Sequence, residues 1–268
     1  MPRLALVTGA SSGIGRACAL HLAGLGYEVL AGVRDPADAP EGLEPLRLDV
    51  TSEADVAAAA ERVGAELHAL VNNAGIAVMG PAEVVPVEEW RRVLEVNVIG
   101  QVAVTRALLP ALLRARGTVV NMSSIGGRVA NPLFGPYSAS KFALEAVSDA
   151  LRREVAPHGV RVVSVEPGGI STPIWAKGMD DAQRIMAGMT AEQERRYADV
   201  IAGVTKIAQR LARDGLPPEK VAEVVGEAVT ADWPRARYVV GREAKVQALA
   251  ARLLPDRLLD FVIRRATT

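Results

Sequence analysis

Short, nearly continuous apolar runs alternate along this chain with longer segments in which apolar residues recur at helical spacing. Runs of Val, Leu and Ile without polar interruption are typical of strands whose two faces are both covered by helices. Small or polar residues follow the runs, which predicts that the strands end there. Such strands are predicted at residues 3–8, 28–33, 43–50, 67–75 (ending in a turn), 117–124, 160–168 and 237–241.

Helices are predicted between these strands. A helical pattern ends near Leu25, and Ser52 with Asp55 predicts the start of a helix that runs through Val63. Further helices are predicted at 86–115, at 136–156 and in several segments of 180–231. Strands that alternate with helices indicate right-handed crossovers and a parallel sheet. We therefore predict an α/β fold in which residues 1–268 form a single Rossmann-like, doubly wound sandwich, with a seven-stranded, mostly parallel sheet.

Composition narrows the possible partners. The chain has 268 residues with 31 basic and 31 acidic side chains, so no net field draws it to nucleic acid. Its one cysteine, Cys18, excludes a disulfide framework and favours a reducing, cytoplasmic location. No signal peptide or uncharged apolar run of about 20 residues is apparent, so we expect no transmembrane segment. His21, His68 and His158 lack metal-ligand spacing, and no metal is expected.

A glycine-rich loop, TGASSGIG at residues 8–15, follows the first strand. Ligands of doubly wound sheets bind at the carboxyl ends of the strands. Glycines let the backbone approach a pyrophosphate, which the N-terminus of the next helix attracts. The spacing G-x-x-x-G-x-G departs from the usual dinucleotide motif, and only the position after the first strand makes the loop specific. The residues predicted to bind the cofactor here are Gly9, Ser11, Ser12, Gly13, Ile14 and Gly15.

The end of the second strand predicts which dinucleotide binds. An arginine at this place accommodates the 2′-phosphate of NADP, whereas an acidic residue binds the ribose hydroxyl of NAD. Arg34 directly follows the predicted strand end and favours NADP(H). NAD(H) remains possible, because Asp35 would take the ribose if the strand ended later.

Other strand ends carry small or polar residues as well. Asp49 and Val50 are predicted beside the adenine, although Asp49 could instead cap the next helix. The sequence NNAG at 72–75 supplies Asn73, Ala74 and Gly75 at the switch point of the sheet, or forms an ordinary turn. After the sixth strand, the residues predicted beside the nicotinamide are Pro167, Gly168, Ile170 and Thr172.

Tyr137 and Lys141 lie four positions apart at the start of a predicted helix, so they share one face. We expect the ammonium to lower the pKa of the phenol and to fit it for proton transfer. Ser124 at the neighbouring strand end could help hold a carbonyl oxygen. Asn97 interrupts a run of valines in mid-helix, which predicts either a local distortion of the backbone or an ordered water.

Together these motifs resemble the classical short-chain dehydrogenase/reductase family over residues 3 to about 241. The resemblance implies a catalytic tetrad of Asn97, Ser124, Tyr137 and Lys141. Tyr137 would be the general acid/base, and Ser124 would polarise the substrate oxygen. Lys141 would bind the nicotinamide ribose and lower the pKa of Tyr137. Asn97 would hold a water in a proton relay.

VEPGGISTPIW at 165–175, with Arg34, resembles the 17β-hydroxysteroid and retinol dehydrogenase branch. This resemblance implies that the substrate is a lipophilic secondary alcohol or ketone, similar to a steroid, a retinoid or a fatty chain. A substrate cap is expected at about 174–216, where the composition shifts. Its candidate pocket residues, which could equally only pack a cap helix, are Trp175, Met179, Ile185, Met186 and Met189, with Leu133 and Phe134 before Tyr137.

A C-terminal helical tail is expected at about 243–268, with four arginines in the apolar stretch that begins at 246. It could lie on lipid, but packing on the domain or a partner subunit is favoured. The family resemblance implies a homodimer or homotetramer, to which the helices at 86–115 and 136–156 could contribute. Two alternative functions are a non-catalytic module that senses NADP and another reaction on the same fold, such as epimerisation. An NAD-dependent alcohol dehydrogenase of the same family is a further alternative.

Overall fold

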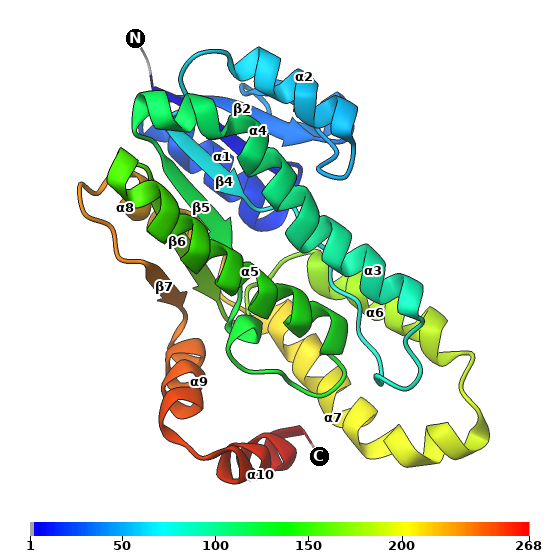
Figure 1. Cartoon of the computed structure of the whole chain (residues 1–268). Helices are drawn as coiled ribbons and strands as arrows, with labels where there is room; N and C mark the ends of the chain where they lie inside the picture. Colours follow the sequence, from blue (N-terminus) through cyan, green and yellow to red (C-terminus); the bar gives the residue numbers. More distant parts are fainter. Residues whose placement is uncertain (1–2, 268) are drawn as a thin grey trace.

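The computed structural model describes residues 3–267, and within them one seven-stranded sheet organises the fold (Figure 1). The strand order is β3-β2-β1-β4-β5-β6-β7, and every neighbouring pair is parallel. The order reverses between β1 and β4, as in a doubly wound sheet, which confirms the predicted fold class. The strands are β1 (Arg3–Thr8), β2 (Tyr27–Val33), β3 (Glu44–Arg47), β4 (Ala69–Asn72), β5 (Thr118–Met122), β6 (Arg161–Pro167) and β7 (Arg237–Val240).

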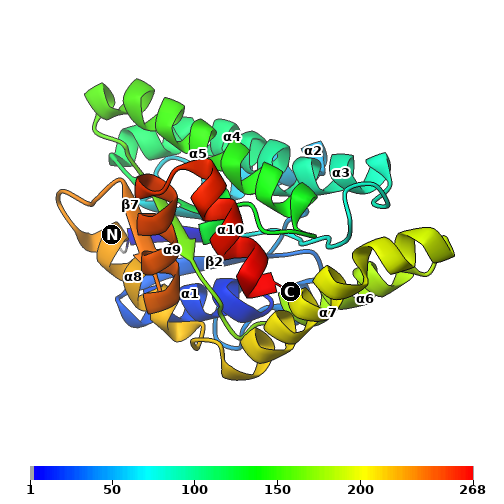
Figure 2. The same ribbon diagram turned by 90° about the horizontal axis from the view of Figure 1, so that it is seen from below.

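Helices cover both faces of this sheet. Figure 2 shows α4 and α5 on one side and α1 and α8 on the other. The helices are α1 (Gly13–Gly24), α2 (Glu53–Val63), α3 (Val87–Leu94), α4 (Gly100–Ala115), α5 (Gly135–Val155), α6 (Ile174–Met186), α7 (Ala191–Asp214), α8 (Glu219–Thr230), α9 (Arg242–Leu253) and α10 (Asp256–Thr267).

Each central strand buries residues on both faces, which explains its uninterrupted apolar run. In β1, Ala5 and Val7 join the core beneath α1 and α8, whereas Leu6 joins the core beneath α2 and α4. Cys18 is fully buried, and burial raises the pKa of its thiol to about 12. The cysteine is therefore a core residue.

Three of the predicted elements differ clearly from the structure. The third and fourth strands are shorter than predicted, because β3 pairs only with β2 and ends at Arg47, while β4 ends where the turn begins at Asn73. The predicted helix at 86–115 is interrupted by a π-helical turn over Glu95–Ile99, with Asn97 at its centre. The expected distortion around Asn97 is confirmed.

Among residues 3–267 one helical stretch, Val87–Ala115, is long and apolar enough to cross a membrane, with a mean hydropathy of 1.5. Half of the relevant window is buried in the domain, where α4 packs against the sheet. The length and composition of this stretch are therefore weak evidence for a span.

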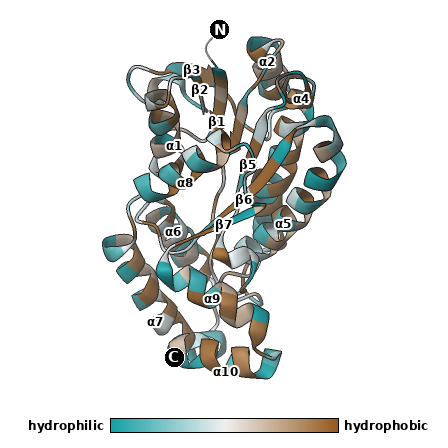
Figure 3. Cartoon of the chain, turned by 90° about the vertical axis from the view of Figure 1, so that its left-hand side faces the viewer, coloured by the Kyte–Doolittle hydropathy of each residue, from teal (hydrophilic) through white to brown (hydrophobic). Residues whose placement is uncertain are grey.

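Helices α6 and α7 lie beyond the carboxyl ends of the strands, and α9 and α10 follow β7 at the same end (Figure 1). Helices α6 and α7 fall within the stretch predicted to form a substrate cap, and α9 and α10 fall within the predicted C-terminal tail. Figure 3 shows them on the side of the molecule away from the N-terminus. These four helices enclose the region in which ligands of such sheets bind.

Candidate active site

A cavity of about 1100 Å³ runs along the carboxyl ends of the strands and under the cap. The structure brings all the predicted cofactor residues to its wall, far apart as they are in sequence. These are Gly9, Ser11, Ser12, Gly13, Ile14, Gly15, Arg34, Asp49, Val50, Asn73, Ala74, Gly75, Tyr137, Lys141, Pro167, Gly168, Ile170 and Thr172.

The glycine loop is shaped by contacts that exclude larger side chains. Gly9 and Gly13 have positive φ values of 66° and 52°, a region that glycine adopts without strain. At Gly15 a Cβ would overlap the carbonyl oxygen of Gly9 and the side-chain amide of Asn73. Asn73 holds the loop, since its amide donates to the backbone oxygens of Thr8 and Gly9 at 3.0 and 3.2 Å.

The loop leads directly into the N-terminus of α1. Ser12 occupies the N-cap position, but its side chain makes no capping hydrogen bond. Ser11 and Ser12 are exposed to the cavity. Orphan N–H groups at a helix N-terminus, beside a loop without Cβ atoms, fit a phosphate group. The residues present therefore fit a dinucleotide.

Arg34 and Asp35 have different orientations. The strand β2 ends at Val33, as predicted, and Arg34 lies exposed on the cavity wall. The Asp35 carboxylate instead accepts a hydrogen bond from the Ala37 N–H at 3.0 Å and caps the short 3₁₀ helix Pro36–Asp38. Asp35 therefore serves the local turn, and Arg34 faces the cavity.

Asp49 lies on the cavity wall and does not cap α2, so its alternative role as a helix cap is wrong. Its carboxylate lies on the cavity wall but accepts hydrogen bonds from the backbone N–H and the hydroxyl of Thr51, at 2.9 and 2.7 Å. The Thr51 N–H bond, with the nearby charge of Arg34, lowers the pKa of this carboxyl although burial opposes it. The adjacent Ser52 caps α2 by accepting from the Asp55 N–H, as predicted.

Ser124 and Tyr137 face the same part of the cavity from β5 and α5. Ser124 follows β5, and its hydroxyl accepts from the Gly126 N–H at 3.0 Å. Burial raises the pKa of Tyr137, and a hydrogen bond with Ser124 opposes this. The pKa of Tyr137 is raised overall, because the effect of burial is larger than the lowering effect of this hydrogen bond. The expectation that Lys141 holds the Tyr137 pKa below its usual value is therefore wrong.

The Lys141 ammonium is turned toward the backbone of β5. Its Nζ donates to the carbonyl oxygen of Met122 at 2.7 Å and lies 5.7 Å from the centre of the Tyr137 ring. Burial lowers the pKa of Lys141 to about 8, although the charge of Glu145 one turn away raises it. Lys141 can therefore change its charge near neutral pH, which an exposed lysine does not do.

Asn97 lies behind the cavity wall and links three segments. Its side chain accepts from the Ile76 N–H at 2.8 Å and donates to the Ile76 carbonyl at 2.9 Å. It also donates to the Ser140 hydroxyl at 3.0 Å, which in turn donates to the Tyr137 carbonyl at 2.7 Å. Asn97 thus fixes the chain after β4 to the first turn of the Tyr137 helix.

A buried ion cluster beside these residues is not evident from the sequence. Arg128 donates two hydrogen bonds to the fully buried Glu166, at 2.6 and 2.8 Å. Arg237 pairs with Glu145 at 2.9 Å and approaches Glu166 to 3.5 Å. The cluster joins the segment after Ser124 to β6 and to α5. An acidic residue near the end of the buried strand β6 is the one sequence signal that points to it.

The predicted substrate residues divide into two groups. Phe134 and Trp175 line the cavity, their rings in edge-to-face contact at 6.2 Å, and the Trp175 indole donates to the Ile170 carbonyl at 2.7 Å. The placement of Met179 and Met186 in the pocket is wrong: neither lines the cavity, because both lie on other faces of α6. The apolar wall is formed mainly by α7 and α10, through Val204, Ile207, Leu211, Leu259, Val262 and Ile263.

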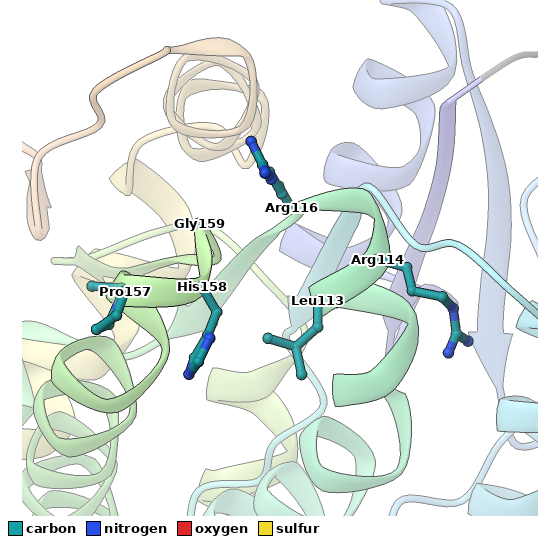
Figure 4. A pocket seen from close by; sticks show the side chains of 7 residues that line it. Leu113, Arg114, Arg116, Pro157, His158 and Gly159 are labelled. Carbon is teal, nitrogen blue, oxygen red and sulfur yellow. The ribbon is translucent and has the colours of Figure 1, made fainter.

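A second hollow lies at the opposite, amino end of the strands (Figure 4). It is formed by the ends of α4 and α5, before β5 and β6 begin, and is remote from Tyr137. Its lining residues are Leu113, Arg114, Arg116, Ala156, Pro157, His158 and Gly159. Residues 3–267 contain no group of three or more His, Cys, Asp or Glu side chains that could hold a metal ion.

The sequence matches the family model described as short chain dehydrogenase over residues 3–183. The NADPH-dependent 3-dehydrocapnine reductase of Ornithobacterium rhinotracheale is 40% identical, over 97% of this chain and 95% of that protein. Retinol dehydrogenase 5 of Mus musculus is 39% identical, over 96% of this chain and 86% of that protein. The 3-ketodihydrosphingosine reductase of Bacteroides thetaiotaomicron is 35% identical, over 98% and 97%.

Solved structures agree with this assignment. A short-chain dehydrogenase from Burkholderia cenocepacia, in complex with NADP, superposes with a TM-score of 0.77 at 28% identity, over 100% of this chain and 98% of that one. A short-chain dehydrogenase/reductase from Burkholderia phymatum, in complex with NAD, gives 0.78 at 27% identity, over 100% and 96%. The chain therefore belongs to the short-chain dehydrogenase family, in a branch similar to retinol dehydrogenases, and is an NAD(P)(H)-binding oxidoreductase that acts on CH–OH or C=O groups.

Proposed function

We propose that the protein is an NADP(H)-preferring oxidoreductase of a lipophilic ketone or secondary alcohol, with Tyr137 as its general acid/base. One observation carries this proposal. A single cavity joins Arg34 and the glycine loop at one end, the Ser124 and Tyr137 hydroxyls in the middle, and an apolar wall of α7 and α10 at the other end. When bound, the nicotinamide dinucleotide supplies or accepts the hydride.

The side chains of the chain divide the remaining work. Tyr137 would give its proton to a ketone oxygen, a role that suits a phenol whose pKa is raised by burial and which is protonated at neutral pH. Ser124 would orient that oxygen. Lys141 would hold the nicotinamide ribose, and Asn97 keeps the Tyr137 helix in place through Ser140.

The preference for NADP(H) rests on Arg34. Its guanidinium is exposed on the cavity wall, where the competing acid Asp35 is engaged in capping. An arginine here pairs with a 2′-phosphate and can stack on the adenine plane. The name of the 3-dehydrocapnine reductase, which includes NADPH dependence, agrees with this preference.

The lipophilic substrate rests on the wall beyond Tyr137. Leu211 of α7 and Ile263 of α10 are among the apolar side chains there, and the aromatic rings of Phe134 and Trp175 line the same cavity. Retinol and 3-ketodihydrosphingosine, which appear in the names of two relatives, are both lipids. We expect a ketone on an extended apolar chain or ring system.

A Tyr137→Phe variant tests the mechanism. Loss of a positioned acid is expected to lower kcat by a factor of about 10² to 10⁴, while cofactor binding remains. Tyr197→Phe is the matched control, because Tyr197 is partly exposed on α7, does not line the cavity, and its hydroxyl donates to the surface residue Glu83. Full turnover by Tyr137→Phe would refute the assigned role. Tight NADPH binding by the native protein without turnover of any ketone or alcohol would instead favour a non-catalytic sensor.

The cofactor preference is tested by titrating NADPH and NADH against tryptophan fluorescence, since Trp175 lies in the cavity. We expect NADPH to bind at least about tenfold more tightly, and Arg34→Asp to remove that preference. Asp35→Asn is the control and should leave it unchanged. An unchanged preference in Arg34→Asp would mean that another group reads the phosphate.

We also propose a homodimer or homotetramer built on α4 and α5. Val102 of α4 and Phe142 of α5 are 38% and 45% exposed, and Ile99, just before α4, is 52% exposed. Large apolar side chains grouped on two adjacent long helices are typical of a subunit contact. Light scattering after size exclusion would show a dimer or tetramer, and Phe142→Glu should shift it toward the monomer.

A further inference from the structure

The C-terminal helices carry an outward apolar face that the fold leaves uncovered. On α9, Leu249 and Leu253 are 57% and 67% exposed, and neither lines the cavity. On α10, Leu258 and Phe261 are 47% and 55% exposed, and they do not line the cavity either. The spacing of four and of three residues puts each pair on one side of its helix. Figure 3 shows apolar positions on both helices at the end of the molecule away from the N-terminus.

The inner side of α10 is apolar too. Leu259 and Ile263 line the cavity, and Thr267 is buried where α10 meets Gly203 of α7. The helix therefore separates the apolar cavity from the outside and has an apolar surface toward each. A helix of this kind is buried on both sides once something apolar covers its outer face.

Positive charges surround the outer face. Residues 242–267 contain six Lys or Arg and three Asp or Glu, a net charge of +3 in a chain whose net charge is zero. Lys245, Arg252, Arg257 and Arg265 are exposed, and none of the four makes an ion pair within residues 3–267. An apolar face with exposed cations beside it is complementary to the interface of an anionic bilayer.

We propose that α9 and α10 dock the protein on an anionic lipid bilayer, with their outward apolar side chains in the headgroup region and the surrounding cations on lipid phosphates. The charge of the segment favours this occupant over a second copy of the chain, because two such faces would oppose like charges. The proposal is independent of which substrate is reduced. In this arrangement α10, which forms part of the cavity wall, is itself in contact with lipid.

The test is flotation of the full chain with phospholipid vesicles. We expect binding to vesicles that contain about a third phosphatidylserine, at least tenfold weaker binding to pure phosphatidylcholine, and loss of binding in high salt. Arg257→Gln/Arg265→Gln should weaken binding to the anionic vesicles at least tenfold, at about 1 kcal/mol per residue. Leu253→Glu/Phe261→Glu should abolish it, and neither of these residues lines the cavity.

Trp233→Glu is the matched control, because Trp233 is 95% exposed in the loop between α8 and β7 and lies outside α9 and α10. It should bind vesicles as the native chain does. NADPH binding by each variant, followed by fluorescence, shows that the domain is folded. The proposal is overturned if the native chain does not float with anionic vesicles. It is also overturned if Leu253→Glu/Phe261→Glu binds normally, or if its main effect is to split a dimer, which would mean that a second copy covers this face.

Discussion

Lys141 is expected to lower the stability of the protein at neutral pH. The residue is only 4% exposed, and burial of its ammonium lowers the pKa from the usual 10.5 to about 8. Each pKa unit corresponds to about 1.4 kcal/mol, so the buried charge costs roughly 3 kcal/mol of folding free energy below pH 8. Replacement by Met, of similar length, removes this cost. It also leaves the Met122 carbonyl without its 2.7 Å partner, which costs about 1–3 kcal/mol at every pH.

The sign of the pH dependence follows from the two pKa values. Between about pH 8 and 10.5 the unfolded chain holds a proton on Lys141 that the folded chain has released. The native protein therefore gains stability as the pH rises through this window, and the cost is constant below it. Lys141→Met lacks this dependence. We therefore take the free energy of unfolding of Lys141→Met and subtract that of the native protein. This difference should be about 3 kcal/mol larger at pH 6.5 than at pH 10.5.

Urea denaturation of the chain without cofactor, at the two pH values, measures this difference. Lys206→Met is the matched control, since Lys206 is exposed on α7 and the same change of charge should show no such window. Lys141→Met should also lose turnover. If the difference in free energy of unfolding between Lys141→Met and the native protein is the same at both pH values, the ammonium is not desolvated. The reasoning from burial would then be refuted.

Three further variants test the packing around the site. Gly15→Ala introduces a Cβ that overlaps backbone atoms of the glycine loop, so NADPH affinity in a fluorescence titration should fall at least about tenfold. Asn97→Ala removes the paired hydrogen bonds to Ile76 and should lower the free energy of unfolding by about 2–3 kcal/mol, measured in urea. Arg128→Ala leaves the buried carboxylate of Glu166 without its double hydrogen bond and should cost about 3 kcal/mol at pH 7; a loss near zero would show that Glu166 takes up a proton instead.

The sequence predicts the sheet and the cofactor end of the cavity well, because local rules control both. An apolar run identifies a buried strand, and the residues that follow it must lie at one edge of a parallel sheet. The end of β2 at Val33 was therefore predictable, and with it the place of Arg34. The direction of the Asp35 carboxylate was not, because a hydrogen bond two residues away decides it.

The substrate end is predicted poorly because distant segments form it. Met179 and Met186 are near the cavity in sequence, but the rotation of α6 points them elsewhere. Ile263 of α10, over a hundred residues after Tyr137, contributes to the wall instead. The raised pKa of Tyr137 could not be predicted from the sequence either, because it depends on how completely the neighbouring elements exclude water from the phenol.

The π-helical turn at Glu95–Ile99 has a consequence for the history and engineering of this chain. Such a turn is one residue longer than the α-helical turn that it replaces, and one residue rotates a helix by about 100°. Deletion of a single residue here would restore a regular helix and turn every later side chain of α4 away from the core that it now fills. Homologues that vary in length should therefore keep this stretch constant, and a designer who shortens the chain can do so in surface loops but not here.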